Sequence, residues 1–243
     1  MSNKISSFIK KKLLGKSKNL ISLDEPYDVM VNLLKDQKVA GVLDAGASDG
    51  RISRKLLRKF PDANAYAFEP NPMYAGALQE YAKNDKRFHP QFMALSDTEG
   101  TAKLHITASP GNTSLCEPGK RLKEIDPQGA NVEKSQDVQI VTIDQWAKRN
   151  GNVGIQLMKF DIQGHELKAL KGAVETLRNS TLLVYVEIWF NSPYEGGALY
   201  SEIDLFFREQ GFVLYDIYKP KYNKDGLIMW ANSIFVNAQK LGI

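Results

Sequence analysis

Apolar residues along the chain follow two spacings in turn, one typical of buried strands and the other typical of helices. Short apolar runs that predict strands lie at residues 39–43, 63–68, 155–161 and 182–188. Helical spacing of apolar residues predicts helices at residues 24–35, 51–60, 72–83, 166–177 and 198–210. Strands and helices that alternate in this way predict an α/β fold, with a parallel sheet covered by helices on both faces.

Two stretches depart from this alternation. In the middle of the chain, residues 88–94, 102–107 and 138–143 have strand patterns, which indicates extra β structure inserted after the third strand. Residues 109–135 are rich in glycine, proline, asparagine and charge, so we interpret them as a mobile flap. Near the end, strands expected at 212–218 and 233–237 follow each other directly, which predicts an antiparallel hairpin at the sheet edge.

Positive charge is concentrated at the N-terminus. Residues 1–18 hold six lysines and no acidic residue, which leaves 26 basic against 28 acidic residues elsewhere. The remainder is therefore net negative, which argues against a nucleic-acid partner. We divide the chain into a basic arm with its helix (residues 1–38) and a single domain (residues 39–243). The arm's apolar residues could lie on an anionic membrane, but a solvated helix packed on the domain is favoured.

Cysteine content and hydropathy bear on the cellular compartment. The single cysteine, Cys116, cannot form an intrachain disulfide, which fits a reducing compartment, and we interpret it as a spectator thiol. No apolar run approaches the roughly 20 residues that span a bilayer. A cytoplasmic location is therefore expected.

A glycine-containing turn follows the first predicted strand. Residues 42–50 read Val-Leu-Asp-Ala-Gly-Ala-Ser-Asp-Gly and lead into a helix. The acid before the glycines, Asp44, would repel the pyrophosphate of a dinucleotide but would suit the cationic amino-acid part of S-adenosylmethionine. The simpler alternative is an ordinary strand-to-helix turn. On the first interpretation, cofactor contacts come from Asp44, Ala45, Gly46, Ser48 and Gly50.

Two further segments could contact an adenosine group. Glu69, followed by Pro70, ends the second strand 19 residues after Gly50, where a carboxylate can accept hydrogen bonds from both ribose hydroxyls. NAD enzymes share this arrangement, so it supports adenosine binding in general. Ser96 and Asp97 follow the third strand and could meet the adenine ring, although a plain turn is the simpler interpretation.

Candidate catalytic residues lie at the carboxyl ends of two strands, where open α/β sheets bind ligands. Asp161 ends one strand and Glu187 lies near the end of the next. We expect Asp161 to contact the cofactor and to take or orient a proton of the acceptor. Lys159 shares a face with Asp161, and a buried lysine needs a carboxylate partner, which Asp161 or Glu187 could supply. A purely structural ion pair is the alternative for Lys159 and Glu187.

Histidines and metals complete the candidate chemistry. His165 opens the helix after Asp161 and is either a proton acceptor or a solvent-facing residue at the helix start. His89 and His105 are given no role. Asp161 and Glu187 offer oxygen ligands for magnesium, but two carboxylates are weak evidence, so no metal is expected to be required.

One segment resembles a known family. Residues 159–166 read Lys-Phe-Asp-Ile-Gln-Gly-His-Glu and continue to Leu-Lys-Gly-Ala at 170–173, which is similar to the signature of the FkbM methyltransferases. Supporting segments lie at 44–50, 68–71, 94–97, 112–115 and 141–144. The resemblance implies a Rossmann-like class I methyltransferase fold, with a mostly parallel seven-stranded sheet, and S-adenosylmethionine as cofactor. It also implies O-methylation, commonly of sugars or polyketide-type hydroxyls. Gln163 stands where the family usually has glutamate.

Four functions are therefore weighed. The leading hypothesis is an S-adenosylmethionine-dependent O-methyltransferase that acts on a sugar, a glycan or a similar hydroxylated metabolite. A non-catalytic protein that binds the same cofactor is conceivable because of Gln163. An NAD-type oxidoreductase lacks its glycine pattern here, and a nucleic-acid methyltransferase lacks the basic cleft that it would need.

Overall fold

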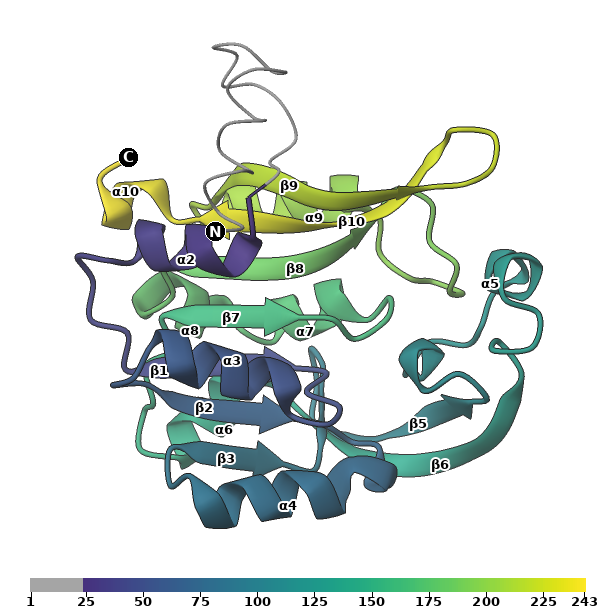
Figure 1. The fold of residues 1–243 in the computed structure, drawn as a ribbon, viewed down its shortest axis with the longest axis horizontal. Helices are drawn as coiled ribbons and strands as arrows, with labels where there is room; N and C mark the ends of the chain where they lie inside the picture. The colour runs from purple at the N-terminus through teal and green to yellow at the C-terminus, as the bar shows by residue number, and fades with distance from the viewer. Residues whose placement is uncertain (1–23) are drawn as a thin grey trace, which may run out of the picture.

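The computed structural model describes residues 24–243, which fold around a seven-stranded sheet of order β3-β2-β1-β7-β8-β10-β9 (Figure 1). Strands β3 to β8 in that order pair in parallel, whereas β10 runs antiparallel to both of its neighbours. The strands are β1 Gly41–Ala45, β2 Asn64–Phe68, β3 Phe88–Gln91, β7 Leu157–Phe160, β8 Leu183–Trp189, β9 Val213–Tyr222 and β10 Ile228–Val236. The predicted parallel sheet and its antiparallel edge hairpin are confirmed.

Helices cover both faces of the sheet, as the alternating pattern predicts (Figure 1). On one face lie α2 Pro26–Leu33, α3 Arg51–Lys59 and α4 Ala75–Asn84. On the other lie α6 Ile143–Arg149, α7 Glu166–Lys171, α8 Val174–Asn179 and α9 Tyr200–Glu209, and α10 Ala238–Leu241 follows the last strand. This arrangement leaves the carboxyl ends of the parallel strands as one open edge.

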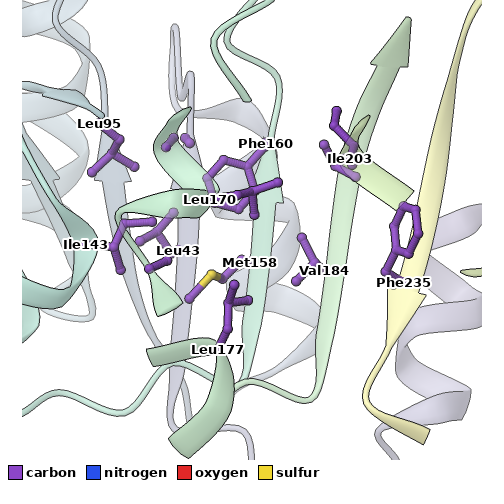
Figure 2. Close-up of a cluster of buried hydrophobic side chains, with 14 of the residues drawn as sticks. Leu43, Leu95, Ile143, Met158, Phe160, Leu170, Leu177, Val184, Ile203 and Phe235 are labelled. Atoms are coloured by element: carbon purple, nitrogen blue, oxygen red, sulfur yellow. The ribbon is translucent and has the colours of Figure 1, made fainter. Parts of the chain in front are cut away.

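Side chains of the central strands alternate between two cores. Val42 and Leu157 pack with α2 and α3, while their neighbours Leu43 and Met158 pack in the core on the other face (Figure 2). All four are fully buried. Because successive strand residues point to opposite faces, Lys159 lies on the same face as Leu157, among the residues that contact α2 and α3. This places a lysine beneath the open edge of the sheet.

A second, three-stranded sheet is inserted after β3, as predicted, and extends beyond the carboxyl ends of the main strands (Figure 1). It consists of β4 Ala94–Leu95, β5 Gly100–Thr107 and β6 Val132–Val141. The single strand predicted at residues 88–94 is divided between the two sheets. Residues 88–91 pair with β2, whereas β4 pairs with β6.

The long loop predicted at residues 109–135 is partly wrong, because much of it has regular structure. It contains a short 3-10 helix, η2 Pro110–Asn112, then α5 Lys120–Ile125 and the first residues of β6. Leu122 and Ala130 are buried against Trp189 and Tyr194, which belong to β8 and the loop that follows it. This apolar contact gives the segment a packed position above the sheet edge.

Two other departures concern helices. Helix α6 was not predicted; it begins directly after β6, where the Thr142 hydroxyl accepts a hydrogen bond from the backbone N–H of Gln145 (3.1 Å). The helix predicted at 166–177 is divided into α7 and α8 at Gly172. A Cβ atom at Gly172 would collide with the carbonyl oxygen of Ser96, so the close approach of these two segments requires glycine.

The N-terminal helix α2 packs on the sheet through Tyr27 and Met30, which are buried. The lysine-rich arm and its suggested membrane contact lie outside the described residues. Among residues 24–243, no helix has both the length and the apolar character that a membrane crossing demands.

Candidate active site

A cavity of about 220 Å³ opens at the carboxyl ends of β1, β2 and β7. Its walls come from the turn after β1, the end of β2, residues 93–95, residues 110–115 of the insertion and residues 161–165. Glu187 of β8 also contributes. Ligands of open α/β folds bind at this edge of the sheet, so the cavity is the candidate active site.

The turn after β1 is shaped by Gly46. Its φ angle is 76°, and a Cβ atom there would collide with the carbonyl oxygen of Asp161. The backbone N–H groups of Gly46 and Ala47 each donate to the carbonyl of Phe68 at 3.0 Å. Ala45, Gly46 and Ser48, three of the residues predicted to contact the cofactor, line the cavity. Gly50 does not line it but precedes α3 with a φ angle of 75°.

Asp44 does not face the cavity, in contrast to its predicted role. The side chain is fully buried, and its Oδ1 lies 3.0 Å from Nζ of Lys159. Oδ2 accepts a hydrogen bond from the Ser53 hydroxyl (2.6 Å). The carboxylate therefore neutralises a buried lysine instead of meeting the charge of a ligand.

Lys159 has a different principal partner from those predicted. Besides Asp44, its ammonium donates to the carbonyls of Ala45 (3.2 Å) and Gly46 (2.9 Å). Asp161 is a more distant neighbour at 4.0 Å. Burial opposes the charged form, but the Asp44 and Asp161 carboxylates outweigh it and raise the lysine pKa. Lys159 thus supports the turn from beneath and does not line the cavity.

Glu69, the residue predicted to hold the ribose hydroxyls, lies in the cavity wall together with Pro70. Its Oε2 accepts from the backbone N–H of Ser48 and its Oε1 from that of Asn71, both at 2.8 Å. Burial raises the pKa of Glu69, although these two hydrogen bonds act in the opposite direction. The carboxylate therefore joins the first turn to the second and keeps further lone pairs for a ligand.

Ser96 and Asp97 do not line the cavity; residues 93–95, just before them, do. The Ser96 side chain is buried and contacts His165 (Oγ to Nε2, 3.1 Å), while Asp97 is exposed. The predicted contact of Ser96 and Asp97 with adenine stays a prediction, and neither side chain lines the cavity. The backbone N–H of Ser96 donates to the carbonyl of Val141 on β6 (3.0 Å), which continues the β4–β6 contact.

Asp161 and Glu187 both line the cavity, and Gln163 joins them. The Gln163 amide nitrogen donates to Oδ1 of Asp161 (2.7 Å) and to Oε2 of Glu187 (2.9 Å). The Asp161 side chain is 42% exposed, whereas Glu187 is buried. Burial, followed by the charges of Asp161 and Glu166, raises the pKa of Glu187 well above its usual range. Asp161 is therefore the member of this pair that ligands can reach.

His165 lines the cavity and is buried, so the solvent-facing alternative is wrong. Its Nε2 contacts the Ser96 hydroxyl, and its Nδ1 lies 3.7 Å from the sulfur of Cys116. Burial, with a smaller effect of Lys168, lowers the pKa of His165 to about 4. The imidazole is therefore neutral at physiological pH. Burial raises the pKa of Cys116, which keeps this thiol protonated.

Two supporting residues were not singled out in the sequence. Glu166 is fully buried, and its carboxylate accepts from the backbone N–H groups of Ile162 and Gly164, both at 2.9 Å. Burial raises its pKa to about 7. Tyr194 donates its hydroxyl to Oε1 of Gln163 (2.8 Å). An acid two residues after glycine is a local signal for Glu166, but no local pattern links Tyr194 to Gln163.

The charge of the cavity wall is one-sided. It carries the carboxyl groups of Glu69, Asp161 and Glu187, and none of the described residues that line it is lysine or arginine. Within residues 24–243, no group of three or more His, Cys, Asp or Glu side chains is placed to hold a metal ion. The site therefore favours a cationic ligand over one with phosphates.

Comparison with known proteins shows a family match for the part of the chain that forms this site. Residues 44–214 match the family model described as "Methyltransferase FkbM domain". "2-O-methyltransferase NoeI" of Sinorhizobium fredii is 29% identical over 162 residues, which cover 64% of this chain and 65% of that protein. "Methyltransferase sdnD" of Sordaria araneosa is 29% identical over 193 residues, which cover 70% and 73% of the two chains.

Among solved structures, methyltransferase FkbM from Methylobacillus flagellatus aligns with a TM-score of 0.50 at 14% identity. The alignment covers 82% of this chain and 44% of that one. This chain thus spans less than two thirds of both that structure and NoeI. The structural likeness concerns the fold.

Proposed function

This chain belongs to the FkbM family of methyltransferases, and from that premise we propose that it methylates a hydroxyl oxygen of a sugar, a glycan or a similar hydroxylated metabolite. The family match includes the turn at Asp44–Gly50 and the segment around Asp161. The enzyme class and the cofactor, S-adenosylmethionine, agree with the sequence prediction. The atom that receives the methyl group and the nature of the acceptor are the parts that we propose.

The residues of the cavity fit S-adenosylmethionine, which supplies an activated methyl group on a positively charged sulfonium. The wall carries three carboxyl groups and, among the described residues, no lysine or arginine. Gly46 lines the cavity, and because it has no side chain the turn lies directly against the carbonyl of Asp161. Ala45 to Ser48 would hold the amino-acid part, Glu69 the ribose hydroxyls, and residues 93–95 the base.

One hydrogen bond within the turn argues against the NAD-type oxidoreductase. A dinucleotide binds its pyrophosphate at backbone N–H groups that are free to donate to it. Here Glu69 accepts the N–H of Ser48 within the turn itself. The non-catalytic alternative rested on Gln163. This side chain donates hydrogen bonds to Asp161 and Glu187, so the site still holds a linked set of polar groups.

One observation carries the proposed chemistry: the Asp161 carboxylate reaches the cavity while one of its oxygens is fixed. Oδ1 accepts from Gln163, and the side chain is 42% exposed. Its backbone touches the Gly46 turn, because Asp161 N–H donates to the Ala45 carbonyl (3.1 Å). An acceptor hydroxyl beside Asp161 would give its proton to the carboxylate as the oxygen becomes nucleophilic.

The other candidates suit this role less well. His165 is neutral, but its lowered pKa makes it a weak base, and both ring nitrogens have neighbours. Glu187 is buried, and burial together with the charges of Asp161 and Glu166 raises its pKa, which disfavours the ionised form that a base needs. Lys159 is engaged beneath the turn. We therefore assign proton transfer to Asp161 and orientation of the acceptor to Glu187 and His165.

Two considerations support a hydroxyl of an uncharged molecule as the acceptor. The relative NoeI is named a 2-O-methyltransferase, which supports oxygen as the atom methylated. The acidic cavity wall would repel phosphate or carboxylate groups on an acceptor. Neutral sugars and polyols remain compatible with both.

An acceptor panel tests the proposal. The purified protein is incubated with S-adenosylmethionine and with neutral sugars or oligosaccharides, each paired with its phosphorylated or uronic-acid counterpart. We expect formation of S-adenosylhomocysteine and a methyl ether on the neutral members, with the charged counterparts poorer by at least about tenfold. Methyl transfer only to nitrogen or to anionic acceptors would contradict the proposal, as would cofactor binding without transfer to any hydroxyl.

A further inference from the structure

Gln163 contacts four segments of the active site, three through its side chain and one through its backbone carbonyl. Its amide nitrogen donates to Asp161 after β7 and to Glu187 on β8. Its amide oxygen accepts from Tyr194 in the loop after β8. Its backbone carbonyl accepts from the hydroxyl of Ser114 in the insertion (2.7 Å). Both amide hydrogens and the amide oxygen are thus engaged within the site.

Chemistry fixes the orientation of this amide. Carboxylate oxygens of Asp161 and Glu187 accept hydrogen bonds, so the NH₂ group of Gln163 must face both of them. The Tyr194 hydroxyl then meets the amide oxygen, to which it can donate. The backbone of Gln163 has a φ angle of 58°, an uncommon value for a side chain other than glycine, and the surrounding contacts maintain it.

We propose that Gln163 is a positioning residue, whose amide holds the Asp161 and Glu187 carboxyl groups together as a divalent cation would in another site. The inference rests on the proposed function, in which Asp161 takes the proton of the acceptor hydroxyl. Without the bridge, neighbouring carboxyl groups repel one another, and the half-exposed Asp161 side chain is free to rotate toward solvent. With it, one oxygen of Asp161 is fixed and the other is left for the acceptor.

A neutral bridge has a specific advantage at this position. A bound cation would add positive charge to the cavity that must receive a sulfonium. The amide of Gln163 satisfies one oxygen of each carboxyl group and adds no net charge. The acidic wall therefore still attracts the cofactor, and the carboxyl groups of Asp161 and Glu187 stay in place.

The arrangement predicts different results for two substitutions of similar size. Gln163→Met removes both donors and leaves the carboxyl groups without a bridge. Gln163→Glu replaces the bridge with a third carboxylate between Asp161 and Glu187, and three such oxygen ligands suit Mn²⁺ or Mg²⁺. Gln163→Glu should therefore create a cation site that the natural protein does not have. Gln145→Met, on the exposed surface of α6, makes the same chemical change away from the site and serves as control.

The experiment has one arm that needs no turnover and one that measures it. In the first, Mn²⁺ alone is titrated into each folded full-length protein by calorimetry. We expect Gln163→Glu to bind it at least about tenfold more tightly than the natural protein or either Met variant. In the second, Gln163→Met should lower kcat about 10–100-fold, the scale of a small misplacement, while the KM for S-adenosylmethionine changes little. Tyr194→Phe should give a smaller fall in kcat of the same kind.

The two arms of this experiment, the Mn²⁺ titration and the turnover measurement, test this inference separately from the function on which it rests. Equal Mn²⁺ binding by Gln163→Glu and the natural protein would overturn the bridging role, whether or not an acceptor is found. Natural kcat per folded molecule in Gln163→Met would overturn it as well. A natural protein that methylates no hydroxyl refutes the proposed function alone, and the Mn²⁺ titration still decides the arrangement around Gln163.

Discussion

The ammonium of Lys159 lies 3.0 Å from Oδ1 of Asp44, and the two residues are direct neighbours across the β1–β7 pairing. Both are buried, and the lysine also donates to two carbonyls of the turn that lines the cavity. Taking two charges out of water costs several kcal/mol, which contacts of this quality can offset. The pair thus couples the stability of the sheet to the shape of the cofactor turn.

Breaking this pair should destabilise the fold strongly. Lys159→Met leaves the Asp44 carboxylate buried without its counter-ion, so we expect a loss of about 3–5 kcal/mol in the free energy of unfolding. The double variant Lys159→Met, Asp44→Leu should lose clearly less than the sum of the two single variants. Urea unfolding of all four proteins measures both quantities. Additive losses would show that the two charges do not depend on each other.

Local sequence patterns predict most of the fold because the spacing of apolar residues distinguishes a strand from a helix within a few residues. The sheet, its helices and the edge hairpin follow in this way. Helix α6 is not predicted because it has only seven residues, too few to show a helical period after a strand. The break between α7 and α8 is not predicted for another reason. It depends on the contact of Gly172 with Ser96, which are distant in sequence.

The same distinction applies to the site. The glycine turn and the acids at strand ends are local signals, and Gly46, Glu69 and Asp161 all line the cavity. The partner of Lys159 depends instead on which strand lies beside β7, and the sequence pattern does not specify that β1 pairs with it in this register. Likewise, Tyr194 meets Gln163 across 31 residues of chain only because both segments close over one edge of the sheet.

Glu69→Ala should weaken binding of S-adenosylmethionine by about 1.5–3 kcal/mol, the scale of hydrogen bonds to a charged group. The carboxylate lines the cavity and also holds the N–H groups of Ser48 and Asn71, so its removal loosens the turn as well. Calorimetric titration measures the affinity. Glu80→Gln, on the exposed side of α4, is the matched control. Equal affinity in the folded Glu69→Ala protein would remove Glu69 from the cofactor site.

The stability of the folded protein should decrease as pH falls, partly because of His165. Its folded pKa of about 4 lies below the value of about 6.5 in an unfolded chain, so the unfolded state binds the proton more readily between these values. The stability that neutral His165 contributes is therefore present above pH 6.5 and is lost as pH falls through 4. The loss amounts to about 3 kcal/mol.

Comparison with His165→Gln isolates this contribution from that of other groups. Glu166, whose pKa burial raises to about 7, acts in the opposite sense, since its stabilising protonated form is gained as pH falls. Urea unfolding between pH 4 and 7 should show a shallower dependence on pH for His165→Gln than for the natural protein. Parallel curves would mean that His165 titrates alike in both states.

The segment of residues 109–135 should open more readily than the sheet beneath it. It contacts the loop after β8 through two backbone hydrogen bonds, Gly119 to Pro193 and Glu195 to Glu117, and through the cluster around Leu122. Lys120, Arg121 and Lys123 on α5 are exposed to trypsin. We expect cleavage there in the free protein and slower cleavage with cofactor and acceptor bound.

Cleavage rates at basic residues outside this segment provide the internal control for the protease. The expectation fails if trypsin leaves residues 109–135 intact in the free protein. It also fails if bound ligands do not alter the rate of cleavage there.

Asp161→Asn tests the chemistry most directly. The asparagine side chain has the same shape, and its oxygen can still accept the hydrogen bond from Gln163, so the geometry of the site should be retained. What is lost is the basicity of the carboxylate. If Asp161 takes the acceptor proton, turnover should fall about 10²–10⁴-fold, while affinity for S-adenosylmethionine falls much less.

The alternative role of Asp161 is structural, and it predicts the reverse pattern. Lys159 lies 4.0 Å from Asp161 but only 3.0 Å from Asp44, so removal of the Asp161 charge should cost little stability. Turnover per folded molecule, measured beside a urea unfolding curve, separates the two roles. An Asp161→Asn protein that is less stable but turns over normally when folded would exclude Asp161 as the base. Glu187 and His165, the other titratable groups at this end of the cavity, would then be the residues to substitute.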